Sequence, residues 1–184
     1  SSSVSINLTS GVVNLFSTLS SFAALKNDGS VITWGNPYTG GSSSNSSGSV
    51  AEKISSNVSK LFSTFEAFAA LKKDGSVITW GSIAGGDSSS VSNFLNEGVI
   101  DVFSTRTAFA ALKEDGSVVV WGVNKSSDTS LVDNDLKSSV TKIFSNTDSF
   151  AALKEDGSVV TWGDSTSGGD SSSVSSQLSS GIKK

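Results

Sequence analysis

Apolar and polar residues follow the same order four times along this chain. The copies read VVNLFSTLSSFAALKNDGSVITWG from Val12, VSKLFSTFEAFAALKKDGSVITWG from Val58, VIDVFSTRTAFAALKEDGSVVVWG from Val99 and VTKIFSNTDSFAALKEDGSVVTWG from Val140. Each copy closes on a tryptophan, and these are Trp34, Trp80, Trp121 and Trp162. A period of roughly 40 residues indicates one supersecondary unit used several times, which decides the architecture before any local assignment.

Three strands are expected in each copy. In the first copy, residues 12–16 form an apolar-rich run, residues 22–26 a run of small side chains, and residues 30–34 a β-branched and aromatic run. Every copy carries Asp-Gly between its last two runs, here at Asp28 and Gly29. That dipeptide tolerates the positive φ of a tight turn, so the second and third strands are predicted to form a hairpin.

A sparse apolar pair precedes each copy, as with Val4 and Leu8 ahead of Gly11. The i, i+4 spacing, with serine before and glycine after, fits one or two helical turns. It fits a short irregular edge segment equally well, because serine and asparagine are weak helix formers. A Gly/Ser-rich loop follows each copy, and the longest, residues 36–49, holds Pro37 and Tyr38.

One unit is too small to fold alone. Ordering about 42 residues costs roughly 60 kcal/mol at ~1.5 kcal/mol per residue, and so short a chain buries too little apolar surface to offset that cost. Neighbouring units must therefore share a core, and the aromatic residues that recur in register are expected to form it. These are Phe16, Phe62, Phe103 and Phe144, then Phe22, Phe68, Phe109 and Phe150, and the four tryptophans.

We expect a single repeat domain over residues 1–184, with units at 1–46, 47–87, 88–128 and 129–170 and the start of a fifth unit at 171–184. The opening SSSVSINLTSGV and the closing SSSVSSQLSSGI are the same part of the repeat. Ring-shaped repeats often close by letting one terminus complete the unit that the other begins. Here the overlap is redundant, so either one copy hangs loose or a ring is completed between chains. Methionine is absent even at position 1, so we expect a processed product or a piece of a longer chain.

Composition narrows the classes of function. The net charge is −4 and Arg106 is the only arginine, which argues against nucleic acid as a partner. The absence of cysteine excludes disulfides, and the absence of histidine removes the usual general base and the commonest zinc ligand. No apolar run reaches 18 residues, so membrane insertion is not expected. Abundant Ser, Gly, Thr and Asn without Cys or Met is typical of bacterial secreted proteins, so we expect an extracellular or cell-surface location.

The stretch from Val12 resembles the blade repeat of the RCC1 (regulator of chromosome condensation) family of β-propellers. The matching features are the apolar first strand, the short strand with Ala24-Leu25, the turn Asp28-Gly29 and the ending Trp34-Gly35. The resemblance implies an all-β fold of antiparallel, four-stranded propeller-type blades, with the sparse apolar segment as the fourth strand or its linker. The family usually has seven units, with Gly and then His between the first two strands. This chain has four units, and the first has Thr18 and Ser21 in those columns.

The looser bacterial relatives of the family are the closer comparison. No residue matches a site for nucleotide exchange, so that activity is not carried over from the family.

Acidic residues are the first candidates for chemistry. The aspartates that precede the hairpin glycines could form an acidic ring. Aspartate at the tip of a hairpin is favoured because it helps to form the turn, so that role explains them without a binding site. They are Asp28, Asp74, Asp115 and Asp156, and the lysines that could pair with them across the hairpins are Lys26, Lys72, Lys113 and Lys154. The dense cluster Asp128, Asp133 and Asp135, and the GGD segments at Asp87 and Asp170, lack the spacing of a calcium motif and read as acidic loops.

No serine stands beside a base, so no catalytic residue, metal site or cofactor is predicted. The tryptophans could stack on sugars, but their invariance favours core positions. Tyr38, Phe65 and Arg106 break the repeat symmetry and are the candidate partner-binding residues, because interfaces favour loop aromatics and arginine.

Two functions are therefore open. The first is a non-catalytic structural scaffold that assembles with itself, as a homo-oligomer or a ring completed between chains. The second is a module that binds a surface glycan or protein through its variable loops.

Overall fold

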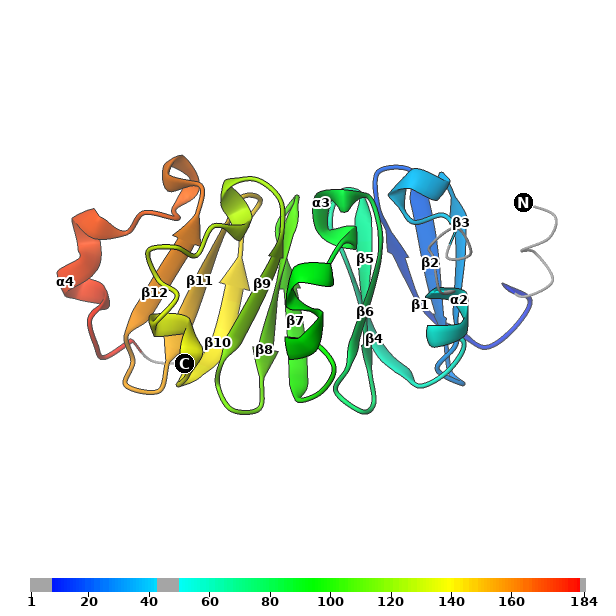
Figure 1. Cartoon of the computed structure of the whole chain (residues 1–184), viewed down its shortest axis with the longest axis horizontal. Helices are drawn as coiled ribbons and strands as arrows, with labels where there is room; N and C mark the ends of the chain where they lie inside the picture. The colour runs from blue at the N-terminus through cyan, green and yellow to red at the C-terminus, as the bar shows by residue number, and fades with distance from the viewer. Residues whose placement is uncertain (1–7, 43–49, 183–184) are drawn as a thin grey trace.

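The computed structural model describes residues 8–42 and 50–182 and contains four three-stranded antiparallel sheets. Each sheet is one blade, and the blades stand side by side with the chain ends at opposite ends of the row (Figure 1). Blade 1 holds β1 (Val12–Ser17), β2 (Ser21–Lys26) and β3 (Val31–Gly35), and blade 2 holds β4 (Val58–Ser63), β5 (Ala67–Lys72) and β6 (Val77–Gly81). Blade 3 holds β7 (Val99–Ser104), β8 (Ala108–Lys113) and β9 (Val118–Gly122), and blade 4 holds β10 (Val140–Ser145), β11 (Ser149–Lys154) and β12 (Val159–Gly163).

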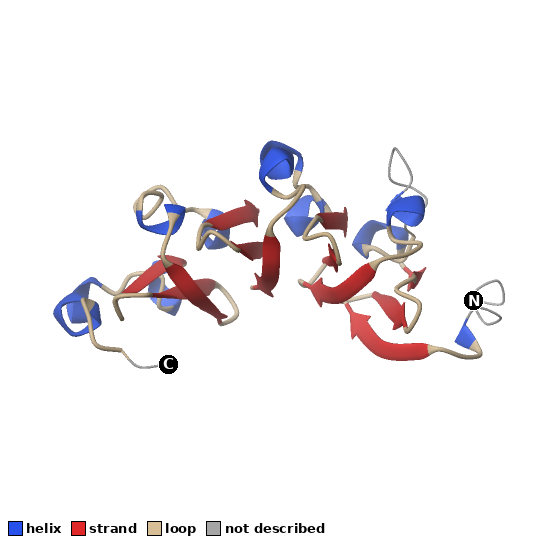
Figure 2. Cartoon of the chain, turned by 90° about the horizontal axis from the view of Figure 1, so that it is seen from below, coloured by secondary structure: helices blue, strands red, loops and turns tan. Residues whose placement is uncertain are grey.

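The blades follow an arc, with most helical segments on its convex side (Figure 2). The first strands of successive blades contact one another, which places them on the concave side. The middle strand pairs with both others, so the third strand is the outer edge of each described blade. The three predicted strands and the hairpin between the second and third are confirmed in every unit.

The hairpin turns have the predicted chemistry. Gly29 has φ +80° and Gly75 has φ +79°, a backbone conformation that favours glycine. The Asp28 carboxylate accepts hydrogen bonds from the N–H and the hydroxyl of Ser30, at 2.9 and 2.7 Å. The equivalent aspartates Asp74, Asp115 and Asp156 make the same two bonds to Ser76, Ser117 and Ser158. These side chains are therefore turn acceptors.

The segments between blades are helical, which decides between the two alternatives left open for them. They comprise α2 (Val50–Lys53), η3 (Ser89–Phe94), η5 (Asp135–Lys137), and η7 (Ser172–Val174) with α4 (Ser175–Leu178). The expectation of a fourth strand is wrong for the described blades. In the three linkers that have a blade on both sides, the apolar pair is spaced for a helical turn and packs against two blades at once instead of extending a sheet. The pair at Val4 and Leu8 begins outside the described residues.

Shorter turns follow the third strands, at η2 (Pro37–Thr39), α3 (Ile83–Gly86), η4 (Lys125–Ser127) and η6 (Ser165–Ser167). They share one edge of the molecule with the turns between first and second strands. The turns between first and second strands contain Thr18, Thr64, Thr105 and Asn146 in equivalent positions. The side-chain oxygen of each accepts a hydrogen bond from the backbone N–H three residues on. Side chains that close the turn thus occupy the column where the resembled family usually has glycine.

The core lies between blades. Each of three apolar clusters joins the face of one blade, the following linker and the facing side of the next blade. Phe68, Phe109 and Phe150 are at most 1 % exposed and Trp80, Trp121 and Trp162 at most 3 %. The prediction that the recurring aromatic residues form the core is therefore confirmed for these positions, which lie between two blades. It is wrong at the two ends of the row of blades. Phe22 and Phe144 are 47 % and 50 % exposed, because no described blade covers them.

Candidate functional site

The blade interfaces are built from one recurring contact. A phenylalanine of the second strand stacks on the tryptophan opposite it on the third, as Phe68 does on Trp80 with ring centroids 5.3 Å apart. The stacked pair packs on the preceding blade, and the Trp80 indole N–H donates to the Gly40 carbonyl there at 3.1 Å. Trp121 donates to Gly85 at 3.0 Å in the same way. Trp162 is buried without a hydrogen-bond partner, because the loop after blade 3 has a different sequence.

The leading face of blade 1, defined by Val12, Leu15, Phe22 and Trp34, carries the same set of residues, and no other blade among the described residues covers it. Leu15 is 63 % exposed, whereas its equivalents Leu61, Val102 and Ile143 are at most 3 % exposed. Phe22 stacks on Trp34 at 5.4 Å, so the pair is already arranged as in the buried interfaces. A contiguous apolar surface of this kind marks an interaction site.

The trailing face, defined by Phe144 of blade 4 together with Val174, Leu178 and Ile182 of the segment that follows it, is at the opposite end of the row. The Ile182 N–H donates to the Gly157 carbonyl at 3.1 Å. This repeats the bonds from Val58, Val99 and Val140 to Gly29, Gly75 and Gly116. Val174 and Ile182 nevertheless remain 40 % exposed, because no described blade follows.

The residues predicted to bind partners lie on one edge of the molecule. Phe65 and Arg106 occupy equivalent turns of blades 2 and 3, and Tyr38 belongs to η2 on the same edge. Backbone hydrogen bonds join these turns across the blades, from Leu19 to Phe65 at 2.7 Å, Phe65 to Arg106 at 3.0 Å and Arg106 to Thr147 at 2.8 Å. Tyr38 is 82 % and Phe65 46 % exposed, so this row of turns is open to a partner. Binding by these residues stays a prediction.

Arg106 is held in place on this edge. Its guanidinium lies 3.5 Å from the Asp148 carboxylate, and Lys125 lies 3.5 Å from Asp164. The four side chains border a shallow cavity of about 400 Å³. Hydrogen bonds from the Thr166 hydroxyl and N–H, with the charge of Lys125, keep the pKa of Asp164 below its ordinary value.

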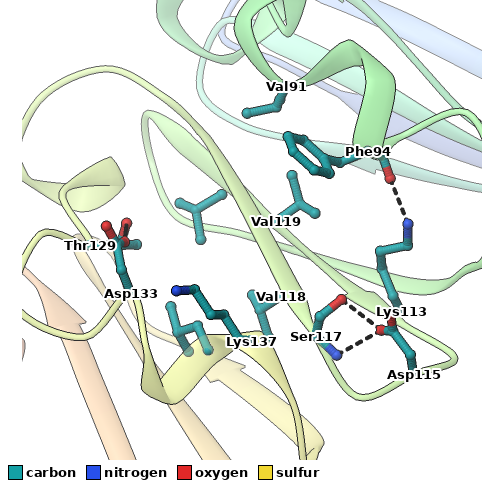
Figure 3. A pocket seen from close by; sticks show the side chains of 12 residues that line it. Val91, Phe94, Lys113, Asp115, Ser117, Val118, Val119, Thr129, Asp133 and Lys137 are labelled. Carbon is teal, nitrogen blue, oxygen red and sulfur yellow. Dashed lines mark hydrogen bonds between the residues drawn. The ribbon is translucent and has the colours of Figure 1, made fainter.

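A larger groove of about 620 Å³ follows the outer strand β9. Val91 and Phe94 form one side, and Thr129, Asp133 and Lys137 the other (Figure 3). Its charged groups are engaged locally: Lys113 donates to the Phe94 carbonyl at 3.0 Å, and Lys137 donates to the Asn134 side chain at 2.8 Å. The Ser117 hydroxyl in this groove donates to the Asp115 carboxylate at 2.6 Å, the same turn contact that the other hairpins make.

The other acidic candidates act as local acceptors. Asp128, Asp87 and Asp170 each accept the N–H two residues on, from Ser130, Ser89 and Ser172. No group of three metal-ligating side chains occurs within the ranges that the structure describes. The predicted pairing of the hairpin lysines with the tip aspartates is a charge interaction without direct contact in the described chain. The charges of Lys26, Lys72, Lys113 and Lys154 help to lower the pKa values of Asp28, Asp74, Asp115 and Asp156. The Lys113 and Lys154 ammonium groups donate to carbonyls of the linkers.

Comparison with solved structures identifies the fold. Human WBSCR16 matches with a TM-score of 0.57 at 20 % identity, over 83 % of this chain and 47 % of that one. Yeast RCC1 (Prp20), solved with Kap60, matches with 0.54 at 19 % identity, over 83 % and 42 %. The four units share the propeller-blade fold of the RCC1-like structures.

The chain spans about half the length of these solved propellers. The ectodomain of the receptor kinase CR4 from Physcomitrella patens also matches, with a TM-score of 0.56 at 15 % identity, over 84 % of this chain and 41 % of that one. No protein-family model and no curated protein matches the sequence. No helix of the described residues is long and apolar enough to cross a membrane. Leu15 and Phe22 were not predicted as functional residues, because the periodic pattern gives every copy of the repeat the same core assignment.

Proposed function

We propose that this chain is a non-catalytic structural scaffold that assembles with other copies of itself through its end faces. One observation carries the proposal: Leu15 and Phe22 on the leading face of blade 1 are exposed, and Val12 and Trp34 are half-buried, whereas their equivalents in blades 2, 3 and 4 are buried. Burying a side chain of the size of Phe or Leu contributes about 1.5–3 kcal/mol. A set of four such residues can therefore offset a substantial part of the association cost of ~4–15 kcal/mol.

Light scattering on a sizing column, at several concentrations of the 184-residue chain, tests the proposal. The mass is expected to rise above the 18.8 kDa of one chain as concentration increases. Leu15→Ser with Phe22→Ser should lower the mass to that of a monomer. Val13→Ser is the matched control on the same strand, because Val13 is 54 % exposed and its equivalent Ile100 stays 46 % exposed beside a covering blade. A wild-type chain that stays monomeric at every concentration would refute the proposal.

The second candidate is a binding module for a surface glycan or protein. The row of turns with Tyr38, Phe65 and Arg106 supports it, since the three side chains share one edge of a rigid, hydrogen-bonded framework. Yeast RCC1 was solved bound to Kap60, and a second structure of Prp20p is described with its binding to Gsp1p and histones, so propellers of this fold bind proteins. Tyr38→Ala with Arg106→Ala should abolish ligand capture and leave the solution mass unchanged.

We propose an extracellular or cell-surface location, on the composition described above. Detection of the native protein by surface proteolysis of intact cells supports it, and recovery only from the lysed interior contradicts it.

A further inference from the structure

We propose that two copies of this chain close head to tail into a ring of eight blades, with Phe22 and Trp34 of each copy seated against Gly168 of the other. The proposal rests on the end-to-end assembly proposed above and names its geometry and its partner, a second copy. Its basis is the equivalence between the free ends and the interfaces inside the chain.

The interfaces between blades 1 and 2 and between blades 2 and 3 show which backbone position receives a stacked Phe–Trp pair. The backbone at Gly40 comes so close to the next blade that an added Cβ would lie 2.6 Å from the Phe68 ring. At Gly85 the corresponding distance to the Phe109 ring is 3.0 Å. At both glycines the carbonyl accepts the indole N–H of the next blade. A glycine with a free carbonyl and an open side is therefore the seat for an incoming pair.

Gly168 is such a seat without an occupant. Its φ and ψ of 96° and 6° match the 95° and 7° of Gly40, and each glycine ends a short turn capped by the side chain of Asp164 or Asn36. A Cβ on Gly168 would meet only the Asn146 amide, at 3.9 Å. No backbone donor among the described residues bonds to its carbonyl. The space and the acceptor that the Phe22 and Trp34 pair needs are both present.

A second pair of backbone groups matches across the same two ends. A backbone hydrogen bond joins the turn between the first and second strands of each blade to the equivalent turn of the next blade. The N–H of the earlier turn donates to the carbonyl of the later one, and the last of these bonds runs from Arg106 to Thr147. In the described chain this series leaves the Thr147 N–H at one end and the Leu19 carbonyl at the other. Head-to-tail contact would join them and continue the series between copies.

The linker of the new junction is also in place. The Gly157 hairpin already receives the Ile182 N–H, as the other hairpins receive Val58, Val99 and Val140. A Cβ on Gly157 would lie 2.8 Å from the Gly181 nitrogen, the same close approach that Gly75 and Gly116 show to their linkers. The segment 171–182 thus takes the linker position, and the incoming copy has to supply only its leading face.

Two copies suffice to close the ring. The four blades form an arc (Figure 2), and the chain aligns with 41–47 % of the residues of three solved chains that share its fold. Unlike faces that meet head to tail generate either a closed ring or an open fibre. An arc that covers about half of a propeller returns to its start with one further copy, which covers both leading faces and both trailing faces.

Gly168→Ala and Gly98→Ala form the decisive pair of variants. Both glycines have positive φ, +96° and +73°, and a Cβ on Gly98 would make only an ordinary contact with the Lys113 side chain at 3.5 Å, so both substitutions strain the backbone without an internal clash. Gly98 lies between blades 2 and 3, away from both end faces. We expect wild type to form a dimer by analytical ultracentrifugation. We expect Gly168→Ala to weaken that dimer by about tenfold or more, since its methyl group would enter the Phe22 ring position, while Gly98→Ala stays within about twofold of wild type.

The outcomes separate the two proposals. A dimer that Gly168→Ala weakens and Gly98→Ala does not supports the ring. A dimer equally strong in both variants overturns the Gly168 seat but leaves end-to-end assembly standing. Trimers or growing fibres overturn closure by two copies, and a wild-type monomer at every concentration overturns assembly itself. Equal melting temperatures of the two variants under monomeric conditions show that a loss of dimer is not a loss of folding.

Discussion

The aspartate at each hairpin tip stabilises the turn as a charged acceptor. In blade 2, the Asp74 carboxylate accepts from both the hydroxyl and the N–H of Ser76, and these bonds, which favour the ionised form, hold its pKa below the ordinary value of 3.8. The pKa of Asp115 is lowered in the same way by Ser117. The carboxylates are exposed, so each effect is small, but it recurs in every blade.

Stability is therefore expected to depend on pH in the acid range. A carboxylate whose folded-state pKa lies below 3.8 stabilises the fold above that pH, and the contribution is lost as pH falls through the lowered pKa. Melting temperatures measured from about pH 5 to about pH 2.5 should fall for wild type and fall less for Asp74→Asn with Asp115→Asn. Ser76→Ala, which leaves the N–H donor, should reduce the slope by less. An unchanged slope in the double variant would contradict this role.

At the scale of elements, the linkers fasten each blade to the next. The Val31 N–H donates to the Ile54 carbonyl at 3.0 Å, and Val77 donates to Leu95 at 2.9 Å, so the end of a linker bonds to the outer strand of the blade it leaves. Its apolar side chains enter the cluster between the two blades, where Ile54 is fully buried and Leu95 is 2 % exposed. A linker of one or two turns gains its stability from this packing, because so short a helix is unstable alone.

Leu136 tests this packing role. It is 4 % exposed in the cluster between blades 3 and 4, whereas Leu131, five residues earlier in the same connection, is 95 % exposed. Leu136→Ala should lower the free energy of unfolding by about 2–5 kcal/mol, and Leu131→Ala should change it by less than about 0.5 kcal/mol. Urea denaturation monitored by tryptophan fluorescence measures both. Equal losses would show that the linker does not hold the blades together.

The strands and linkers differed in how far the sequence could specify them. Residues 22–26 and 30–34 were predictable because a β-branched run and an Asp-Gly turn carry local information. Observed strands differ from the predicted ones by a residue at some ends, as with Ser21–Lys26. The linkers were ambiguous because serine and asparagine favour no element strongly, so burial of Leu95 or Leu136 between blades decides their form.

At the scale of the whole molecule, position in the row decides which residues are available for assembly. Leu15 and Leu61 have the same local sequence pattern, yet one is 63 % and the other 3 % exposed. Periodicity could predict that the repeats share a core, but it assigns every copy the same environment. The end faces follow only from knowing the order of the blades in space, as does the matching of Gly168 to Gly40.

The same asymmetry predicts how protection from hydrogen exchange varies along the row. Blades 2 and 3 contribute to an apolar cluster on both faces, whereas blade 1 does so on only one. In the Leu15→Ser, Phe22→Ser variant, which should be monomeric, amides of β2 should exchange faster than those of β5 and β8, since stability in repeat arrays is a sum over neighbouring interfaces.

In wild type, β2 should become as protected as β5 once concentration favours assembly, because the second copy then supplies the missing interface. Amide hydrogen exchange, measured by mass spectrometry at low and high protein concentration, distinguishes the monomeric protein from the assembled one. Uniform protection in the monomer would mean that the array unfolds only as a whole. Fast exchange of β2 that persists in an assembled wild-type protein would place the contact between copies away from the leading face.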